Sequence, residues 1–553
     1  MPVHPYHPYP LDSSHFRSLR SMKRLYFVQR SDSPATATGR NVRGCQHSPC
    51  VAPLMILYQV LRRVTFNSLP IELQTEIFFF CMSPFPRFSI KEAPIVLARV
   101  CSTWRSIVLS TPRLWSSFEV EIQGSGPPGL LHDTRLMHRM KLWLERSTYS
   151  PLSFRLVYNS VGHVSDDRST QLLAALVSQA RRWRSAHFTL PAASIAKLQP
   201  FPPNSFPTLR SLTFKVCSGV RSSPSDPPLN ILTMNIPWRQ LTGLDLQLGA
   251  NNLPTLDEAM NILSQTVNLK HGTLQLECTW DRLDIRGDKL SLPMLDTLQL
   301  ILRDAGTAAD RLGACLMQFL NLLCLPKLRV LRLGWLASSN VGSWSLAHTD
   351  FLAFLGASAE TLRELTMTYF PISENELLEC ISQVPHLTHL DLRFPLHEGA
   401  NDPITNRLLA SCTISSSTIS GDIAYITPAH AEIPLLPRLE HINLQCHGAL
   451  YANATLLKLI QSRWKSGKGG EGQLGQGGAP GQLRYFRLLS MKPVPSEVEK
   501  HVKAWRGEGL EIDIQCLVVR WYVCVCVCVC FEHWVMIYTH FWTVGTVDYQ
   551  NSQ

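Results

Sequence analysis

Apolar residues recur along much of the chain in the order Leu-x-x-Leu-x-Leu, with a polar residue between the last two. The clear copies centre on Leu212, Leu244, Leu298, Leu331, Leu365, Leu390 and Ile442, and poorer copies centre on Ala186, Leu274 and Phe486. Alternation of apolar and polar positions predicts a short strand with one buried face. We therefore expect ten such strands between residues 161 and 516.

The stretches between these copies have the apolar spacing of helices, for example at residues 256–269 and 375–384. The first eight central residues lie 24 to 34 residues apart, close to the length of one unit in a repeat protein. Stacked units of this kind bury one continuous core. The pattern predicts an α/β repeat array, with an ordinary α/β domain as the alternative. The wider spacings after Leu390 imply loops or missed units.

A second signal, at residues 66–118, predicts two short helices with apolar faces. Proline suits a first helical turn because the N–H that it lacks has no partner there, so Pro70 is expected to open the first helix. The first apolar stripe is Leu69, Leu73, Ile77 and Phe80, and the second, in a helix expected to begin near Ala93-Pro94, is Leu97, Val100, Trp104 and Ile107. A unit of about fifty residues is marginal alone, so its apolar face is expected to dock on a partner or a neighbouring domain.

These residues resemble the F-box motif. The order Leu69-Pro70, Ile77-Phe78, Val100-Cys101-x-x-Trp104-Arg105 and Leu114-Trp115 follows that motif, and the run from Ala93 to Ser116 resembles the F-box proteins expanded in mushroom-forming fungi. In that group, irregular leucine-rich repeats commonly follow, and the repeats of this chain resemble them. The loop at residues 79–92 is longer than in the general F-box pattern.

The sequence patterns and the resemblance together predict an α/β fold class in five zones. A basic, disordered arm at residues 1–65 precedes a small all-helical F-box at 66–118, and a connecting helix and first strand follow at 119–160. Residues 161–516 form an irregular leucine-rich-repeat solenoid, which has a curved parallel sheet with helices outside. Residues 517–553 form a low-complexity tail.

The resemblance also implies a function. F-box proteins bind the Skp-family adaptor of an SCF (cullin–RING) ubiquitin ligase and capture a protein substrate with their C-terminal repeats. The implied adaptor contacts are Leu69, Pro70, Leu73, Ile77, Val100, Cys101, Leu114 and Trp115, with Trp104 and Ile107 in the core of the motif. The alternative is an F-box and leucine-rich-repeat interaction scaffold that acts outside ubiquitination.

The polar residues between the repeat leucines are small and mixed in charge, which favours a protein-binding face over a nucleic-acid groove. Five residues of types that are common at interface hot spots are the predicted substrate contacts: Arg332, Trp335, Tyr369, Phe370 and Arg393.

Composition narrows the class of protein further. The chain has 553 residues, of which 45% are hydrophobic and only 17% charged, and a net charge of +10. Residues 1–50 hold seven Lys and Arg against two Asp and Glu, so half of that charge lies in the predicted arm. The charge therefore does not indicate a nucleic-acid partner.

No set of residues has the spacing of a catalytic site, so we expect no enzyme activity and no cofactor or metal. Cys45 and Cys50 have the spacing of metal ligands but lack a second ligand pair. The chain begins without the features of a secretory signal, and no uncharged apolar stretch reaches the roughly 18 residues that a membrane span needs. We therefore expect a cytoplasmic or nuclear protein with reduced cysteines and no membrane partner.

The end of the chain has an unusual composition. The dipeptide Val-Cys occurs four times from Val523 to Cys530. Such alternation would make an apolar strand prone to aggregation. A GT dinucleotide repeat also encodes Val-Cys in one reading frame, so the tail is predicted to derive from a repeat tract or an unspliced intron.

Overall fold

The computed structural model describes residues 66–123, 130–159, 167–198, 201–217, 229, 231–249, 252–278, 289–304, 312–336, 344–397, 399, 401–414, 435–465 and 481–517. The chain divides into two compact units between Pro70 and Ile71. In the first unit, the short 3-10 helix η1 (Phe66–Ser68) precedes Leu69 and Pro70. The predictions for the N-terminal arm, for Cys45 and Cys50 and for the Val-Cys tail lie outside the described residues.

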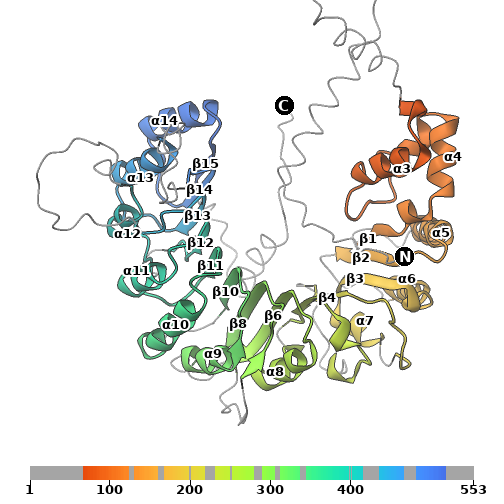
Figure 1. Ribbon diagram of the computed structural model, residues 1–553, viewed down its shortest axis with the longest axis horizontal. Coiled ribbons are helices and arrows are strands. Elements are labelled where there is room, and N and C mark those ends of the chain that lie inside the picture. The colour runs from red at the N-terminus through yellow and green to blue at the C-terminus, as the bar shows by residue number, and fades with distance from the viewer. Residues whose placement is uncertain are drawn as a thin grey trace, which may run out of the picture. The chain divides into compact units, whose positions relative to one another are not determined.

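The second unit is built on one parallel sheet of 13 strands (Figure 1). The strands are β1 (Ser117–Gln123), β2 (Leu152–Asn159), β3 (Trp183–Leu190), β4 (Ser211–Val216), β5 (Gly243–Gln247), β6 (His271–Cys278), β8 (Thr297–Asp304), β10 (Val330–Leu336), β11 (Glu364–Thr368), β12 (His389–Arg393), β13 (His441–Cys446), β14 (Tyr485–Ser490) and β15 (Glu511–Cys516). They pair in chain order. Two short strands, β7 (Leu290–Ser291) and β9 (Leu323–Cys324), pair separately. The predicted α/β class with a large parallel sheet is confirmed.

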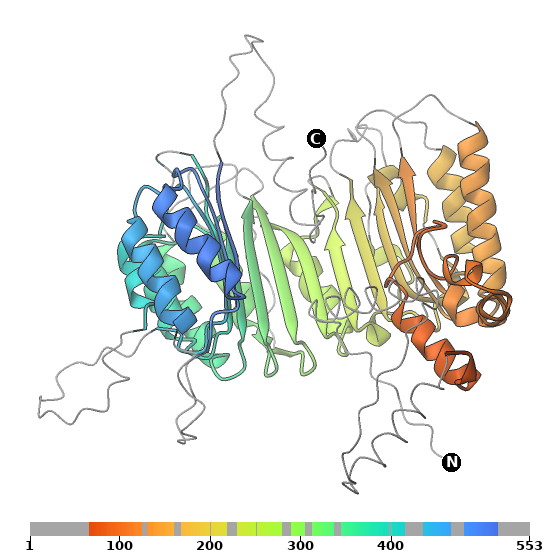
Figure 2. The same cartoon turned by 90° about the horizontal axis from the view of Figure 1, so that it is seen from above.

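Helices cover one side of this sheet, the outer side of its curve (Figures 1 and 2). They are α5 (Leu130–Arg146), α6 (Asp167–Val177), α7 (Ala192–Ala196), α8 (Leu256–Gln265), α9 (Leu312–Asn321), α10 (Ser345–Ala357), α11 (Glu374–Ser382), α12 (Asn406–Ser411), α13 (Asn453–Lys465) and α14 (Ser496–Gly507), with 3-10 turns η4 (Ala180–Arg182), η5 (Ile231–Thr233) and η6 (Trp238–Gln240). The face of the sheet away from these helices is called the open face below.

The repeated leucines form the core between the sheet and the helices. Leu212 pairs with Leu244, and Leu298 with Leu331, so equivalent leucines stack from strand to strand. These side chains are buried, and the polar residues between them lie on the opposite face because side chains alternate along a strand.

One predicted copy is displaced by two residues. The residue paired with Leu244 is Gly272, and not Leu274. A Cβ atom at Gly272 would lie 3.2 Å from the Leu269 side chain. Neighbouring leucine side chains therefore fill the space that a leucine at position 272 would occupy. Because this position is a glycine, a search for repeated leucines does not find the true centre of this copy.

Neither of the two wide spacings after Leu390 adds a strand to the sheet between the flanking copies. Leu390 pairs directly with Ile442, and Ile442 pairs directly with Phe486. At the first loop, the N–H of Leu435 donates to the carbonyl of Ser411 at 3.0 Å. The chain therefore leaves and re-enters the array at nearly the same place.

Several helices begin where local sequence signals place them. Thr255 and Glu258 form a capping box at the start of α8, and Ser373 and Glu376 do the same for α11. In a capping box, two backbone N–H groups of the first turn are satisfied reciprocally. The predicted helices at residues 256–269 and 375–384 are confirmed as α8 and α11.

The helical segment before the sheet contains α3 (Ile71–Phe80), the 3-10 helix η2 (Leu97–Arg99), α4 (Ser102–Ser110) and the 3-10 helix η3 (Pro112–Trp115). The second helix therefore begins at Ser102, later than predicted. Its cap residue Cys101 is extended (φ −155°, ψ 172°), and the Cys101 sulfur accepts from the backbone N–H of Trp104 at 3.5 Å. This extended residue separates η2 from α4.

A glycine after the second loop gives a stability prediction. A Cβ atom at Gly481 would lie 2.6 Å from the backbone oxygen of Arg438, so Gly481→Ala is expected to lower the free energy of unfolding by about 2–3 kcal/mol. The control is Gly507→Ala at the end of α14, where a Cβ atom meets nothing within 4 Å. This control substitution should raise the free energy of unfolding by up to about 1 kcal/mol. Urea unfolding measures both, and equal midpoints would contradict the prediction.

Candidate functional site

The first candidate site is an exposed apolar face on α3. Leu73 is 52% exposed, Ile77 39% and Phe80 74%, and nearby in the sequence Val100 is 59% exposed. In the first unit, Leu69 is half-buried and Pro70 is exposed. Large apolar side chains gathered in one short segment mark an interaction surface when they remain in contact with water.

The opposite side of these helices is packed. Phe78 is fully buried, and its ring lies 5.0 Å from the ring of Trp104 between centroids. Ile107 and Val108 of α4 are also buried. Of the two predicted core residues of this helical segment, Ile107 is buried and Trp104 is half-buried.

Leu114 and Trp115 were predicted as adaptor contacts, but both are buried, at 0% and 1% exposure. The indole N–H of Trp115 donates to the Val108 carbonyl at 2.8 Å, and its ring packs edge-on against Trp143 of α5 at 4.9 Å. Trp115 therefore joins α4 to the first helix of the array. Of the predicted adaptor contacts in the second unit, Leu73, Ile77 and Val100 are exposed and Cys101 is half-buried.

Phe79 and Phe80 of the loop predicted at residues 79–92 belong to α3, and the rest of this segment packs against β1, the first strand of the sheet. Arg87 forms a parallel bridge with Glu119 of β1, and its guanidinium contacts the Glu119 carboxylate at 2.9 Å. Phe88 packs on Phe118 and Trp143, with centroid distances of 5.7 and 4.8 Å. Contacts of Arg87 and Phe88 therefore fix the helical segment to the array.

The second candidate site is the open face of the sheet. Its charged side chains pair with those of neighbouring residues or strands: Arg155 with Glu119 at 3.2 Å, Lys215 with Asp245 at 3.2 Å, Arg332 with Glu364 at 2.7 Å, Arg393 with Asp391 at 2.7 Å and Arg487 with Asp513 at 3.8 Å. Such pairing leaves little net charge to attract a polyanion. The open face is therefore polar and nearly neutral.

The structure divides the five predicted substrate contacts into two groups. Arg332, Tyr369 and Arg393 lie on or beside adjoining strands β10, β11 and β12, and each is partly exposed. Trp335 and Phe370 are buried at 3% and 1% exposure, and their rings lie 5.5 Å apart between centroids. These two rings belong to the core, which corrects their predicted role.

Their burial has a geometric reason. Trp335 is four residues after Leu331 and so has the same inward direction on β10. Tyr369 has φ +54°, an uncommon value for an aromatic residue. This residue turns the chain and sends Phe370 inward, while the N–H of Tyr369 donates to the Arg393 carbonyl at 2.7 Å.

Aromatic rings stack along the same part of the open face. His389 and His441 are parallel within 7° at a centroid distance of 4.0 Å, and Tyr485 continues the stack at 6.1 Å from His441. Sequence reasoning missed Tyr485, although its place directly before Phe486 matches that of His441 before Ile442. Burial would lower the pKa of Arg393, but Asp391 beside it, together with Tyr369 and Tyr485, raises it.

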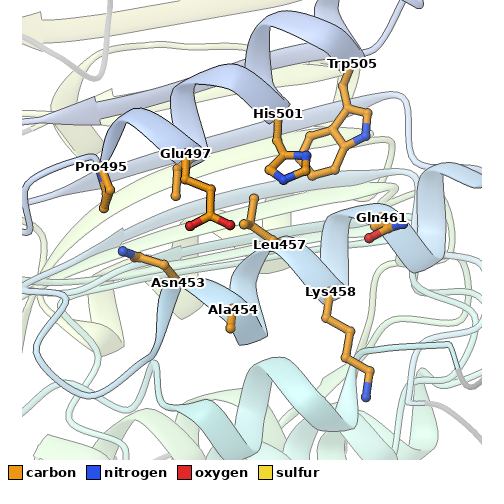
Figure 3. Close-up of a pocket in the computed structure, with 10 residues that line it drawn as sticks. Asn453, Ala454, Leu457, Lys458, Gln461, Pro495, Glu497, His501 and Trp505 are labelled. Atoms are coloured by element: carbon orange, nitrogen blue, oxygen red, sulfur yellow. The ribbon is translucent and has the colours of Figure 1, made fainter.

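A pocket of about 250 Å³ lies between α13 and α14, on the helical side of the array (Figure 3). Its polar wall includes Lys458, Glu497 and His501, and the His501 ring stacks on Trp505 at 5.5 Å. No hydrogen bond joins two of the side chains that line it, so the pocket shows no nucleophile paired with a base.

Three of the described cysteines are poorly suited to act as nucleophiles. Burial raises the pKa of Cys380 and Cys446, and it raises that of Cys217 to about 12. These thiols stay protonated near neutral pH, and the thiolate is the reactive form. Within the ranges that the structure covers, no three His, Cys, Asp or Glu side chains gather as a metal site would require.

Comparisons with known proteins do not assign this chain to a family. In the described part of the chain, no helix has both the length and the apolar character to cross a membrane. No protein-family model matches the chain, and a search of curated proteins finds no match.

Proposed function

We propose that this protein is the substrate-recognition subunit of an SCF (cullin–RING) ubiquitin ligase. The helical segment from α3 to η3 acts as an F-box and binds a Skp-family adaptor. The array from β1 to β15 acts as an irregular leucine-rich-repeat domain and holds a protein substrate on its open face.

The observation that carries the proposal is the division of the helical segment into a buried side and an exposed apolar side. Phe78 and Ile107 pack inside, while Leu73 and Phe80 are exposed at 52% and 74%. An apolar helix face of this kind is costly to leave in water, and it has the composition of a protein interface core. The resemblance to the F-box supplies the class of partner.

The open face supports the substrate role. It is polar, and its charges are paired on neighbouring strands. Arg332, Arg393 and Tyr369 provide partly exposed side chains of types that form interface hot spots. Substrate capture needs no catalytic group on this chain, because ubiquitin transfer in such ligases occurs on other subunits.

Adaptor binding tests the proposal directly. The double variant Leu73→Asp/Ile77→Asp puts two charges on the apolar face and is expected to weaken binding of a purified Skp-family adaptor by about 100-fold or more, which corresponds to roughly 3 kcal/mol. The matched control is Leu346→Asp/Val267→Asp, which changes two exposed apolar residues outside this segment, at 83% and 42% exposure. The control should bind like the unaltered chain.

Calorimetry with the unaltered chain provides the decisive outcome. Absence of adaptor binding would overturn the proposal. Adaptor binding that fails to recruit the cullin and the RING subunit would favour the interaction scaffold instead.

A further inference from the structure

The starts of the strands bring together basic residues that are far apart in the sequence. Ten residues, one from each of ten successive strand starts, form a continuous backbone ladder in which each N–H donates to the carbonyl of the previous member at 2.7–2.9 Å. The ladder runs Arg184, Arg210, Thr242, Lys270, Asp296, Arg329, Arg363, Thr388, Glu440 and Arg484. Figure 2 shows the parallel strands side by side, with their N-terminal ends on the same side of the sheet.

Basic residues also dominate the turns that lead into this ladder. We call the ladder residues and the three residues before each of them the strand-start rim. The basic members that precede the ladder positions are Arg181, Arg182, Arg239, Lys327 and Arg438, and the acidic one is Glu360. The rim therefore holds eleven basic and three acidic side chains, whereas the charges of the open face are paired.

Ion pairs neutralise only part of the rim. Arg329 lies 3.9 Å from Asp296, and Arg484 lies 3.1 Å from Glu440. Both arginines remain well exposed, at 65% and 70% of their side chains. The part of the rim that lies over β3 to β6 contains no Asp or Glu.

That end contains the strongest positive patch. Arg184 and Arg210 are exposed and Lys270 is half-buried, and in the described part of the chain none of the three is in an ion pair with a carboxylate. Parallel strands lie about 4.8 Å apart, so the row from Arg184 to Lys270 spans about 14 Å. An extended polypeptide of about five residues covers that length.

We propose that the strand-start rim over β3 to β6 binds an acidic segment of a polypeptide. The charge of the rim is complementary to Glu and Asp side chains, and arginine pairs with carboxylates through two parallel hydrogen bonds. The inference goes beyond the proposed function, because it names a second surface and needs no adaptor.

Two features favour a polypeptide over a nucleic acid. Among the rim residues, Trp183 is the only Trp, Tyr or Phe, and its side chain is buried. The rim therefore has no exposed aromatic ring of these types on which bases could stack. Asp296 is the ladder residue directly after Lys270. A phosphate backbone that continued past β6 would meet this carboxylate, whereas a polypeptide can place a neutral residue there.

Binding of a labelled oligoglutamate peptide to the full chain tests the proposal. The variant Arg184→Glu/Arg210→Glu/Lys270→Glu is expected to weaken binding at least tenfold at about 50 mM salt. The matched control Lys141→Glu/Lys500→Glu/Lys503→Glu reverses three exposed charges on α5 and α14 and should stay within twofold of the unaltered chain. The neutral variant Arg184→Gln/Arg210→Gln/Lys270→Gln should lie between the two extremes, and thermal unfolding checks that every variant is folded.

Three results would overturn the proposal. The peptide could fail to bind the unaltered chain, or the control could lose as much affinity as the rim variant. Single-stranded or duplex DNA of equal charge could bind more tightly than the peptide and be lost in the rim variant, which would make the rim a nucleic-acid site. Adaptor affinity measured in parallel should not change in the rim variant, so this proposal and the proposed function fail separately.

Discussion

Replacing Arg463 with methionine is expected to lower the free energy of unfolding by about 3–5 kcal/mol. Arg463 lies on α13 and is fully buried. Its guanidinium donates to the carbonyls of Cys412, Leu435 and Leu436 at 2.6, 2.9 and 3.1 Å. Methionine fills much of the space but donates to none of these acceptors.

The three carbonyls belong to two segments that are more than 20 residues apart in the sequence. Cys412 is the C-cap of α12, and Leu435 and Leu436 precede β13. Leu436 also has φ +57°, a strained value for a leucine, so its orientation depends on the bond that Arg463 gives it. Loss of the guanidinium leaves the Cys412 and Leu435 carbonyls without this donor, whereas the Leu436 carbonyl still accepts from the N–H of Leu439 at 3.2 Å. It also removes the link between Cys412 and the segment at Leu435 and Leu436.

Two variants make the prediction specific. Arg463→Lys should recover less than half of the loss, because an ammonium group cannot reach three carbonyls in a fixed fork. Arg506→Met is the control, since the guanidinium of Arg506 donates to the carbonyl of Ile512 at 2.8 Å from an exposed residue and should cost less than about 1 kcal/mol. Urea unfolding monitored by circular dichroism measures all three. A loss below 1 kcal/mol in Arg463→Met would show that the bonds to the carbonyls contribute little.

The sequence predicted the strands whose inward-facing residues are leucines. Strand β1 was not found, because its inward residues are Phe118 and Val120, and β15 was missed because its inward residues are Ile512 and Ile514. The same alternation holds in both strands. A search for any large apolar residue at these positions would have found them, whereas Gly272 carries no signal at all.

The candidate surfaces were predictable only where a short segment contains them. The apolar stripe of α3 occupies consecutive helical turns, so its exposed face could be read from spacing alone. The strand-start rim is different, because successive residues of its ladder are 25 or more residues apart and become neighbours only through strand pairing. Each of them looks like an isolated surface charge in the sequence. The burial of Phe370 likewise depends on the positive φ of Tyr369, which no residue pattern indicated.

Trp115→Ala is expected to lower the stability of the helical segment by about 3–5 kcal/mol. The side chain is 1% exposed, and it loses a 2.8 Å hydrogen bond to the Val108 carbonyl and an edge-on contact with Trp143. The guanidinium of Arg146, 4.4 Å from the indole ring, adds a cation–π contact. Hydrogen exchange at the amides of α4 measures the loss locally, without requiring the whole array to unfold in one step.

A milder variant separates packing from adaptor contact at the same residue. Trp115→Phe keeps most of the ring but not the hydrogen bond, so it should cost about 1–2 kcal/mol of stability and leave adaptor affinity unchanged. Phe80→Ala is the reciprocal control, because Phe80 is 74% exposed: its stability should change by less than about 0.5 kcal/mol, while adaptor affinity falls. If a folded Trp115→Phe chain bound the adaptor ten times more weakly, Trp115 would act through the adaptor interface. The burial of Trp115 leads us to expect the opposite, that it positions the helical segment on the array while α3 makes the contact.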